Sequence, residues 1–322
     1  MAVRVDVIVN RRARHLQGET ALYAAIVGAT EASGAKGTTV HETRSLGDLE
    51  KVVSLLASRG TDAVVLAGGD GSYMAGVTSL SRVFGDRLPS VAFLPGGTVS
   101  TVARNWGLRG SLITYSRALL AAVQNGGAVE TARPTLRVRD ADEGDRVGFM
   151  FGTGLVANFF DEYYGSAHQG YSGAARIVSR IFVGSFVSSA LAARVLTPTP
   201  CTIEVDGATQ NARAFSLVAA SVVKDFGLSM RVLYRAGEDL SRVHVVASPL
   251  GAARLGPQMP LVLAGKKLLG RDHVDALARS FRITFTSDKN AYVLDGEVLR
   301  APSVEVTPGP RLRVLTTTKV DS

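Results

Sequence analysis

The stretch Val64-Val-Leu-Ala-Gly-Gly-Asp-Gly-Ser-Tyr-Met74 decides the fold that we predict for the first part of the chain. An apolar run typical of a buried strand ends in three glycines and an aspartate, and a helix is predicted directly afterwards. Glycines there let backbone N–H groups approach phosphates, and a helix start favours negative charge. Asp70 fits if it orients a magnesium ion, usually through water, or contacts a nucleophile. The alternative is a tight turn capped by Asp70 or Ser72.

A second glycine turn follows the next predicted strand, in Val91-Ala-Phe-Leu-Pro-Gly-Gly-Thr98. The carboxyl ends of parallel strands share one edge of a sheet, and ligands bind there in open α/β folds. We therefore expect the two turns to lie side by side. Thr98 and Arg104 could supply a hydroxyl and a cation to the same phosphates.

Strands and helices alternate through residues 1–131, which indicates a three-layer α/β domain with a parallel sheet covered on both faces. The predicted strands are 5–9, 38–42, 63–67 and 91–94, and the predicted helices are 20–32, 46–58, one from about 72 and one after 98.

The pattern changes near residue 131, where short strands with period-two alternation begin and predict a mostly antiparallel second domain over 132–302. Two helical stretches are expected within it, at about 173–195 and 257–278. The predicted strands are 135–139, 147–151, 202–205, 214–220, 243–247, 281–286 and 304–307.

A pair of carboxylates lies in Ala291-Tyr-Val-Leu-Asp-Gly-Glu-Val-Leu299. Residues two apart on a strand point the same way, so Asp295 and Glu297 could converge to accept a proton from a hydroxyl and hold a metal ion. A hairpin turn of the Asp-Gly type explains the same residues equally well.

Composition narrows the classes of function. The 322 residues include 34 glycines and one cysteine, Cys201, which excludes an intramolecular disulfide framework and favours a buried thiol. The 36 Lys and Arg against 28 Asp and Glu give a net charge of +8, but the basic residues are dispersed, so we predict no nucleic-acid partner. The most apolar stretch, Ile181–Ala193, has 13 uncharged residues, fewer than a membrane span needs, and we expect no transmembrane segment.

Other catalytic patterns are absent from the sequence or poorly placed. We find no Walker A loop, no H-E-x-x-H zinc motif and no G-x-S-x-G elbow. Gly152-Thr-Gly-Leu-Val-Ala157 fits a relaxed dinucleotide pattern, but we interpret it as a turn at the start of the second domain.

Taken together, these motifs make the chain resemble the diacylglycerol kinase catalytic-domain family, which includes bacterial lipid kinases and sphingosine kinases. The resemblance runs nearly end to end through Asn10–Arg14, Thr43, G-G-D-G-S at Gly68–Ser72, L-P-x-G-T at Leu94–Thr98, G-x-G at Gly152–Gly154 and D-G-E at Asp295–Glu297.

The resemblance implies ATP in a cleft between the α/β domain and a C-terminal β-sandwich, with residues 303–322 returning to the first domain. It implies transfer of the γ-phosphoryl group to a lipid hydroxyl at a membrane surface. Asp70 and Asp295 would lie near Mg²⁺, and Glu297, with Asp295, would accept the proton. The implied nucleotide contacts are Asn10, Arg14, Thr43, Gly68, Gly69, Asp70, Gly71, Ser72, Gly97 and Thr98.

The sequence departs from the family at four places. The turn Asn10–Arg14 reads Asn-Arg-Arg-Ala-Arg rather than Asn-Pro followed by small residues, and Ser72 replaces the commoner threonine. Ser100 stands where the family usually has asparagine, and the segment 222–240 lacks the usual glycine triplet and the later Asp-Gly. Glu238 and Asp239 are the carboxylates near that segment, and whether they hold a structural metal stays open.

The acceptor lipid is not specified by the sequence. An acyl chain needs an apolar cavity. The residues that could line it also fit an ordinary hydrophobic core equally well; they are Phe159, Phe160, Ile177, Ile181, Phe182 and Phe186. An NAD kinase-like enzyme and a non-catalytic lipid- or nucleotide-binding protein remain alternatives. We expect a cytoplasmic protein, with peripheral association at the inner face of the membrane and a homodimer both left open.

Overall fold

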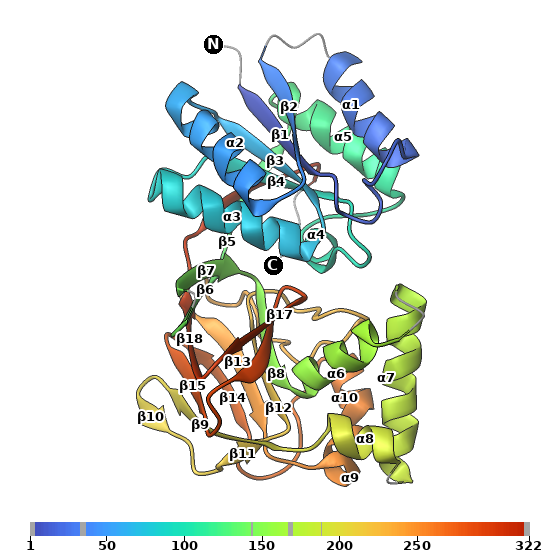
Figure 1. The fold of residues 1–322 in the computed structure, drawn as a ribbon, viewed down its shortest axis with the longest axis vertical. Helices are drawn as coiled ribbons and strands as arrows, with labels where there is room; N and C mark the ends of the chain where they lie inside the picture. The colour runs from blue at the N-terminus through green and yellow to red at the C-terminus, as the bar shows by residue number, and fades with distance from the viewer. Residues whose placement is uncertain (1–3, 33–36, 143, 167–169, 188, 319–322) are drawn as a thin grey trace. The chain divides into compact units, whose positions relative to one another are not determined.

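A computed structural model describes residues 4–32, 37–142, 144–166, 170–187 and 189–318. The chain forms two compact units, which are shown in Figure 1. Unit 1 comprises Met1–Arg133 and Pro310–Ser322, and unit 2 comprises Pro134–Gly309. The sequence placed the corresponding boundaries at residues 131 and 302.

Unit 1 contains a six-stranded sheet with the strand order β2-β1-β3-β4-β19-β5. Strands β1 to β4 are parallel, β19 pairs in parallel with β4, and β5 pairs antiparallel with β19. A strand near the end of the chain therefore lies inside this sheet. The strands are β1 (Val5–Asn10), β2 (Thr38–Thr43), β3 (Ala63–Gly68), β4 (Ser90–Pro95), β5 (Val129–Arg133) and β19 (Leu312–Thr316).

Helices cover both faces of this sheet. Helix α1 packs on α5, and α2 packs on α3; Figure 1 shows the two pairs on opposite sides of the strands. The central strands β3 and β4 are buried along their whole length, because side chains on both faces meet helices. The predicted α/β architecture is thus confirmed. The helices are α1 (Ala21–Ala32), α2 (Leu46–Arg59), α3 (Asp70–Phe84), α4 (Thr101–Asn105) and α5 (Leu112–Gln124).

Unit 2 contains two antiparallel sheets, as predicted. One has the order β10-β9-β15-β18-β6-β7, with β11 pairing to β9, and the other has the order β14-β13-β12-β8-β16-β17. The strands of the first are β6 (Leu136–Asp140), β7 (Gly144–Gly148), β9 (Thr199–Val205), β10 (Ala208–Thr209), β11 (Ala214–Phe215), β15 (Phe281–Phe285) and β18 (Ser303–Pro308). Those of the second are β8 (Met150–Gly154), β12 (Leu217–Ser221), β13 (Val243–Ser248), β14 (Val274–Ala278), β16 (Asn290–Leu294) and β17 (Glu297–Ala301).

Helices pack on the second of these sheets. Val156 of α6 and Ile177 and Ile181 of α7 share a core with Ala219 and Val293 of the strands. Gly154 ends β8 just before α6 and has φ +64, and a Cβ atom there would lie 2.5 Å from the carbonyl oxygen of Ser216. The G-x-G stretch is therefore a strand-to-helix junction. The helices are α6 (Leu155–Tyr164), α7 (Tyr171–Phe186), α8 (Ala190–Val195), α9 (Ala252–Leu255), the 3-10 turn η1 (Gly256–Gln258) and α10 (Met259–Leu263).

The predicted helix over 257–278 is wrong. Only η1 and α10 are helical there, and Val274–Ala278 forms β14 by pairing with β13. Pro257 and Pro260 occupy first-turn positions, and Gly265 at φ +63 follows the end of α10.

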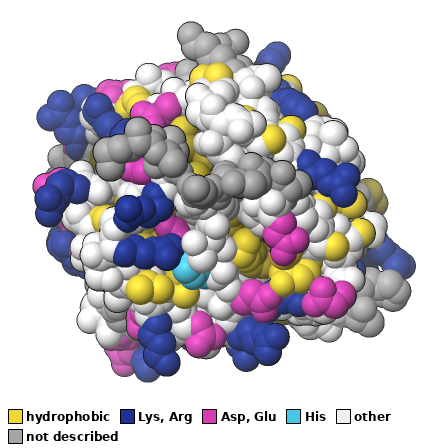
Figure 2. Space-filling view, turned by 90° about the horizontal axis from the view of Figure 1, so that it is seen from above, with side chains coloured by type: hydrophobic (Ala, Val, Ile, Leu, Met, Phe, Trp, Pro, Cys, Tyr) yellow, Lys and Arg dark blue, Asp and Glu magenta, His cyan; other side chains and the backbone are white. Residues whose placement is uncertain are grey.

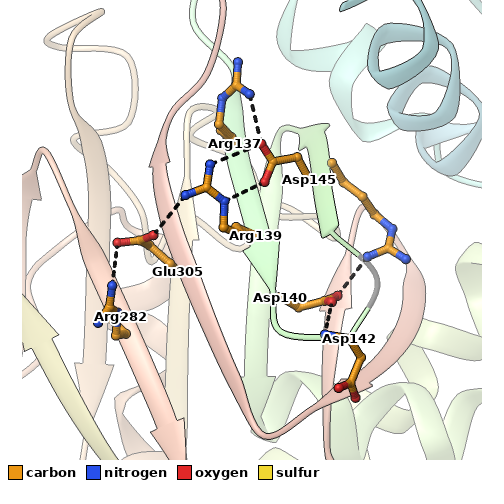
Figure 3. Close-up of polar contacts among 8 residues, drawn as sticks. Arg137, Arg139, Asp140, Asp142, Asp145, Arg282 and Glu305 are labelled. Atoms are coloured by element: carbon orange, nitrogen blue, oxygen red, sulfur yellow. Dashed lines mark hydrogen bonds and ion pairs between the residues drawn. The ribbon is translucent and has the colours of Figure 1, made fainter. Parts of the chain in front are cut away.

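A chain of ion pairs crosses the strands of the first sheet of unit 2 (Figure 3). Asp145 of β7 binds Arg137 at 3.1 Å and Arg139 at 2.7 Å, and Arg282 binds Glu305 at 3.0 Å. The arginine side chains are 40–59% exposed and the carboxylates 28–34%, so water reaches each pair and its contribution is small, on the order of 0–1 kcal/mol.

Charged side chains are mixed on the face of the molecule shown in Figure 2, where Lys and Arg are interspersed with Asp and Glu. Among the described residues, no helix combines the length and apolar character needed to cross a membrane. Cys201 is buried, which raises its pKa to about 11.

Candidate functional site

The first glycine turn joins β3 to α3, and packing excludes a side chain at its first residue. Helix α3 begins at Asp70, and the hydroxyl of Ser72 accepts a hydrogen bond from the N–H of Gly69 at 3.3 Å. A Cβ atom on Gly68 would lie 2.4 Å from the Cβ atom of Ser72. The turn is therefore as tight as the sequence predicted.

The second glycine turn packs directly on the first. The N–H groups of Gly96 and Gly97 donate to the carbonyl oxygen of Gly68 at 2.7 and 3.1 Å. A Cβ atom on Gly97 would lie 2.5 Å from the Cα atom of Gly69. The turns lie side by side as expected, with the half-buried Thr98 next in the chain. However, the N–H groups of Gly96 and Gly97 are already bound within the protein.

Asp70 connects the two turns. Its carboxylate oxygens accept hydrogen bonds from the N–H groups of Thr101 at 2.8 Å and Val102 at 2.9 Å, at the start of α4. Burial raises the pKa of Asp70, and hydrogen bonds from the two amides and from the Thr101 side chain, with the charge of Arg104, offset part of that rise. Each oxygen accepts one of the amide bonds, which leaves acceptor capacity for a water molecule. Asp70 therefore caps α4 and could also orient the water shell of a metal ion.

The ends of β1 and β2 bring two more predicted residues to this edge. Asn10 pairs with Thr43 in the sheet register, and its side-chain amide donates to the hydroxyl of Ser72 at 2.8 Å. Thr43 is buried and donates its hydroxyl to the carbonyl oxygen of Val9 at 3.3 Å. Arg14 is exposed in the turn that follows β1. The structure thus gathers Asn10 and Thr43 beside the first glycine turn.

Arg11 lies within the turn Asn10–Arg14 that the family resemblance implied, and the structure gives it a packing role. Its guanidinium lies 3.6 Å from the centroid of the Tyr23 ring and forms ion pairs with Glu19 at 3.2 Å and Glu42 at 3.6 Å. The side chain is only 7% exposed. Arg11 therefore fastens the turn after β1 to α1, and nothing in the local sequence separates it from its neighbouring arginines.

The D-G-E motif forms a hairpin in unit 2. Leu294 at the end of β16 pairs with Glu297 at the start of β17, and Asp295 and Gly296 form the turn between them. Both turn residues have positive φ, 50° and 89°, as in a type I′ turn. The expectation that Asp295 and Glu297 project from one face of a strand is therefore wrong, because Asp295 lies in the left-handed turn.

The carboxylate of Asp295 is enclosed. It is 3% exposed and accepts hydrogen bonds from the N–H groups of Phe149 at 2.9 Å and Met150 at 3.0 Å. A Cβ atom on Gly148 would lie 2.4 Å from one of its oxygens. Asp295 therefore ties the hairpin to β8, and this position does not fit the role of a direct metal ligand.

Glu297 is exposed beside an unpredicted neighbour, Tyr164 of α6. The Tyr164 hydroxyl donates to the carbonyl oxygen of Gly296 at 2.8 Å. Burial and the negative charge of Glu297 raise the pKa of Tyr164. Sequence reasoning missed Tyr164 because no motif contains it and its partner Gly296 lies 132 positions further along the chain.

The residues predicted for that cavity separate into different environments. Ile177 and Ile181 belong to the core of unit 2, and Phe159 and Phe160 pack against that core. Phe186 is 61% exposed. Its position at the surface contradicts the predicted cavity lining.

Metal binding has a limited basis in the described part of the chain. No group of three or more His, Cys, Asp or Glu side chains among the described residues is placed to hold an ion. Glu238 binds Arg235 at 3.1 Å, and Asp239 accepts hydrogen bonds from Ser241 at 2.7 and 2.8 Å. Asp70 fits contact with an ion through water, as argued above.

Comparisons with known proteins agree with this fold. Residues 4–131 match the family described as the diacylglycerol kinase catalytic domain, which confirms the predicted resemblance. A diacylglycerol kinase structure from Bacillus anthracis str. Sterne is 16% identical, with a TM-score of 0.64 and coverage of 98% of this chain and 97% of its own. Another structure from that bacterium is 17% identical, with a TM-score of 0.70 and the same coverage.

A yeast NADH kinase complexed with NADH shares the two-domain fold more distantly, at 12% identity and a TM-score of 0.51, with coverage of 99% of this chain and 84% of its own. No curated protein matches the sequence. At these identities the structural matches establish the fold, and the kinase assignment comes from the domain match.

Proposed function

Since residues 4–131 carry a diacylglycerol kinase catalytic domain, we propose that the chain transfers the γ-phosphoryl group of ATP to the hydroxyl group of a lipid. The observation that carries this proposal is the contact between the two glycine turns, across which Asp70 reaches the start of α4. Asp70 keeps acceptor capacity beyond its two amide bonds, which a residue that only caps α4 would not need.

The phosphates would bind at the start of α3. Its first hydrogen bond runs from the N–H of Tyr73 to the carbonyl oxygen of Gly69, so the N–H groups of Asp70, Gly71 and Ser72 precede the helical ladder. Such groups are free to bind an anion, which the helix dipole also favours. The side chains assigned to the nucleotide are Asn10, Arg14, Thr43, Ser72 and Thr98, with Gly68, Gly69 and Gly97 allowing its close approach.

Asp70 would hold a magnesium ion through water, with the ATP phosphates as the other ligands. The ion, when bound, neutralises charge that develops on the transferred group. Asp295 has a different role here. Its carboxylate is occupied by backbone amides, so it positions the hairpin that presents Glu297.

Glu297 would accept the proton of the lipid hydroxyl. The hydroxyl oxygen then bonds to the γ-phosphorus, the bond from that phosphorus to the bridging oxygen breaks, and ADP leaves. Tyr164 holds the turn through its bond to Gly296. Positioning and charge neutralisation supply most of the rate enhancement in phosphoryl transfer, and the base contributes less.

The test incubates the purified full chain with labelled ATP, magnesium and separate acceptors. These are diacylglycerol, a sphingoid base, phosphatidylglycerol, a polyprenol and NAD. Label in a lipid supports the proposal, label in NAD replaces it with an NAD kinase, and no transfer to any acceptor favours a binding protein.

Two variants test the site residues. Asp70→Asn and Glu297→Gln should each abolish turnover while the circular dichroism spectrum stays unchanged. Asp86→Asn and Glu50→Gln alter exposed carboxylates elsewhere in unit 1 and serve as matched controls. Wild-type rates in both site variants would refute the assignment.

A further inference from the structure

Helix α7 has one face inside unit 2 and one face outside it. The inward residues recur at helical spacing along Gly173–Ser185 and are buried. The outward residues also recur every three or four positions, so they form one stripe on the opposite side. The outward stripe consists of Arg176, Ser179, Arg180, Val183, Phe186 and Val187, all exposed.

The C-terminal end of this stripe is apolar. Val183 is 62% exposed, Phe186 is 61% exposed and Val187, just after the helix, is 73% exposed. The ring of Phe182 packs edge-on against Phe186 at 5.2 Å and supports it. Single exposed apolar side chains are common, but a cluster on one helix face marks a surface that contacts a partner or a membrane.

The rest of the stripe is positively charged. It carries Arg176 and Arg180, and α7 contains no acidic residue. This charge lies next to the apolar end, because Arg180 and Val183 are three residues apart on the same stripe.

A second basic segment adjoins the end of α7. A Cβ atom on Gly256 of η1 would lie 2.2 Å from the Cβ atom of Ser185, so η1 packs directly on the last turn of α7. From Val243 to Arg271 the sequence contains no acidic residue. This stretch carries four basic residues and two exposed leucines: Arg254, Lys266, Lys267 and Arg271, with Leu263 at 48% and Leu269 at 66% exposure.

From this combination we infer that the outward stripe of α7 docks unit 2 on an anionic lipid surface. Apolar side chains partition into the interface, while nearby arginines and lysines attract the anionic headgroups. We commit to the lipid surface because the exposed arginines flank the apolar end and complement anionic headgroups. A second copy of the chain covering the same stripe is the other occupant, and light scattering in the test below distinguishes it.

This inference deepens the proposed function by placing the enzyme at the membrane that holds its acceptor. Its test needs neither ATP nor turnover, so its failure is distinguishable from failure of the kinase proposal. A chain that binds vesicles but phosphorylates no lipid would keep the docking surface and refute the kinase.

The experiment measures cosedimentation of the full chain with vesicles of equal parts phosphatidylglycerol and phosphatidylcholine, and with pure phosphatidylcholine vesicles. We expect strong binding to the first only. Each surface arginine contributes about fivefold to partitioning, so Arg176→Gln with Arg180→Gln should weaken it roughly 25-fold. Val183→Ser with Phe186→Ser should weaken it on the order of tenfold.

Matched controls remove the same groups from unit 1. Arg44→Gln with Arg117→Gln makes the same charge change, and Leu46→Ser with Leu55→Ser removes exposed apolar groups from α2. Thermal unfolding confirms that each variant folds. Wild-type binding by both stripe variants would overturn the inference. So would light scattering that shows the stripe variants converting a dimer to a monomer without loss of vesicle binding.

Discussion

Replacing Asp295 by asparagine separates positioning from catalysis at the D-G-E hairpin. The carboxylate presents one oxygen to the N–H of Phe149 and the other to the N–H of Met150. Asparagine offers one acceptor oxygen and an NH₂ group, so one of these amides loses its acceptor and faces a donor. An unsatisfied buried donor costs about 1–3 kcal/mol.

The backbone adds little to this figure, because asparagine is favoured in a type I′ turn and tolerates the φ of 50° at this position. We therefore expect Asp295→Asn to lower the free energy of unfolding of unit 2 by about 1–3 kcal/mol. The measurements are urea unfolding and amide hydrogen exchange at Phe149 and Met150, which should accelerate in the variant. Turnover should fall but persist, since Glu297 remains.

A second Asp-Gly turn supplies a matched control. Asp206 has φ 49° and accepts hydrogen bonds from the N–H groups of Arg279 and Ser280, both at 2.8 Å and both on one oxygen. Asparagine keeps that oxygen, so Asp206→Asn should change stability by less than about 0.5 kcal/mol. If Asp295→Asn unfolds like the wild type yet shows no turnover, Asp295 is a catalytic or metal-binding group and our reading of its burial is wrong.

Three further predictions follow from single positions. Ser100 has φ 52° and ψ 54°, so Ser100→Gly should relieve left-handed strain and stabilise unit 1 by about 1 kcal/mol in urea unfolding. Tyr164→Phe removes the bond to Gly296 and should lower kcat about fivefold with KM unchanged, by steady-state kinetics with the accepted lipid. Burial raises the pKa of Asp6. The hydrogen bonds to His41 and Thr61 and the positive charge of Arg59 outweigh this effect, and the pKa lies below its ordinary value of 3.8. The ionised Asp6 therefore stabilises unit 1 fully above pH 3.8, and this stabilisation is lost as the pH falls through the lowered pKa. The free energy of unfolding, measured across that pH range, should fall with pH in the wild type and should not show this fall in Asp6→Asn.

The sheet of unit 1 could be predicted because its strands carry a local signal. Strand β3 is apolar throughout, which suits a strand covered on both faces, and its observed bounds extend the predicted ones by one residue. The position of β19 between β4 and β5 could not be predicted from the residues, since nothing local in Leu312–Thr316 identifies its neighbours. The family resemblance implied only that the last segment returns to the first domain.

Strand β14 shows where local pattern fails. Val274-Asp-Ala-Leu-Ala278 contains strong helix formers, and its spacing suits either period. Pairing of Ala276 with Val245 and of Ala278 with Val243 makes it a strand, and this contact spans more than 30 residues of sequence. A partner at that distance is invisible to propensity, which explains the error.

The glycine turns were predicted correctly in place, and their binding of phosphates stays a prediction. Gly69 and Gly97 are required by their mutual contact before any ligand is considered, and the N–H groups of Gly96 and Gly97 bind Gly68. The glycines therefore indicate that another group lies close to the backbone, but they do not identify whether that group is the protein itself or a ligand. For this chain we propose a phosphate with its metal ion, because the Asp70 carboxylate spans the two turns and keeps acceptor capacity for the water shell of an ion. The proposed phosphate site is the first turn of α3, and it rests on the N–H groups that precede the helical ladder rather than on the glycines themselves.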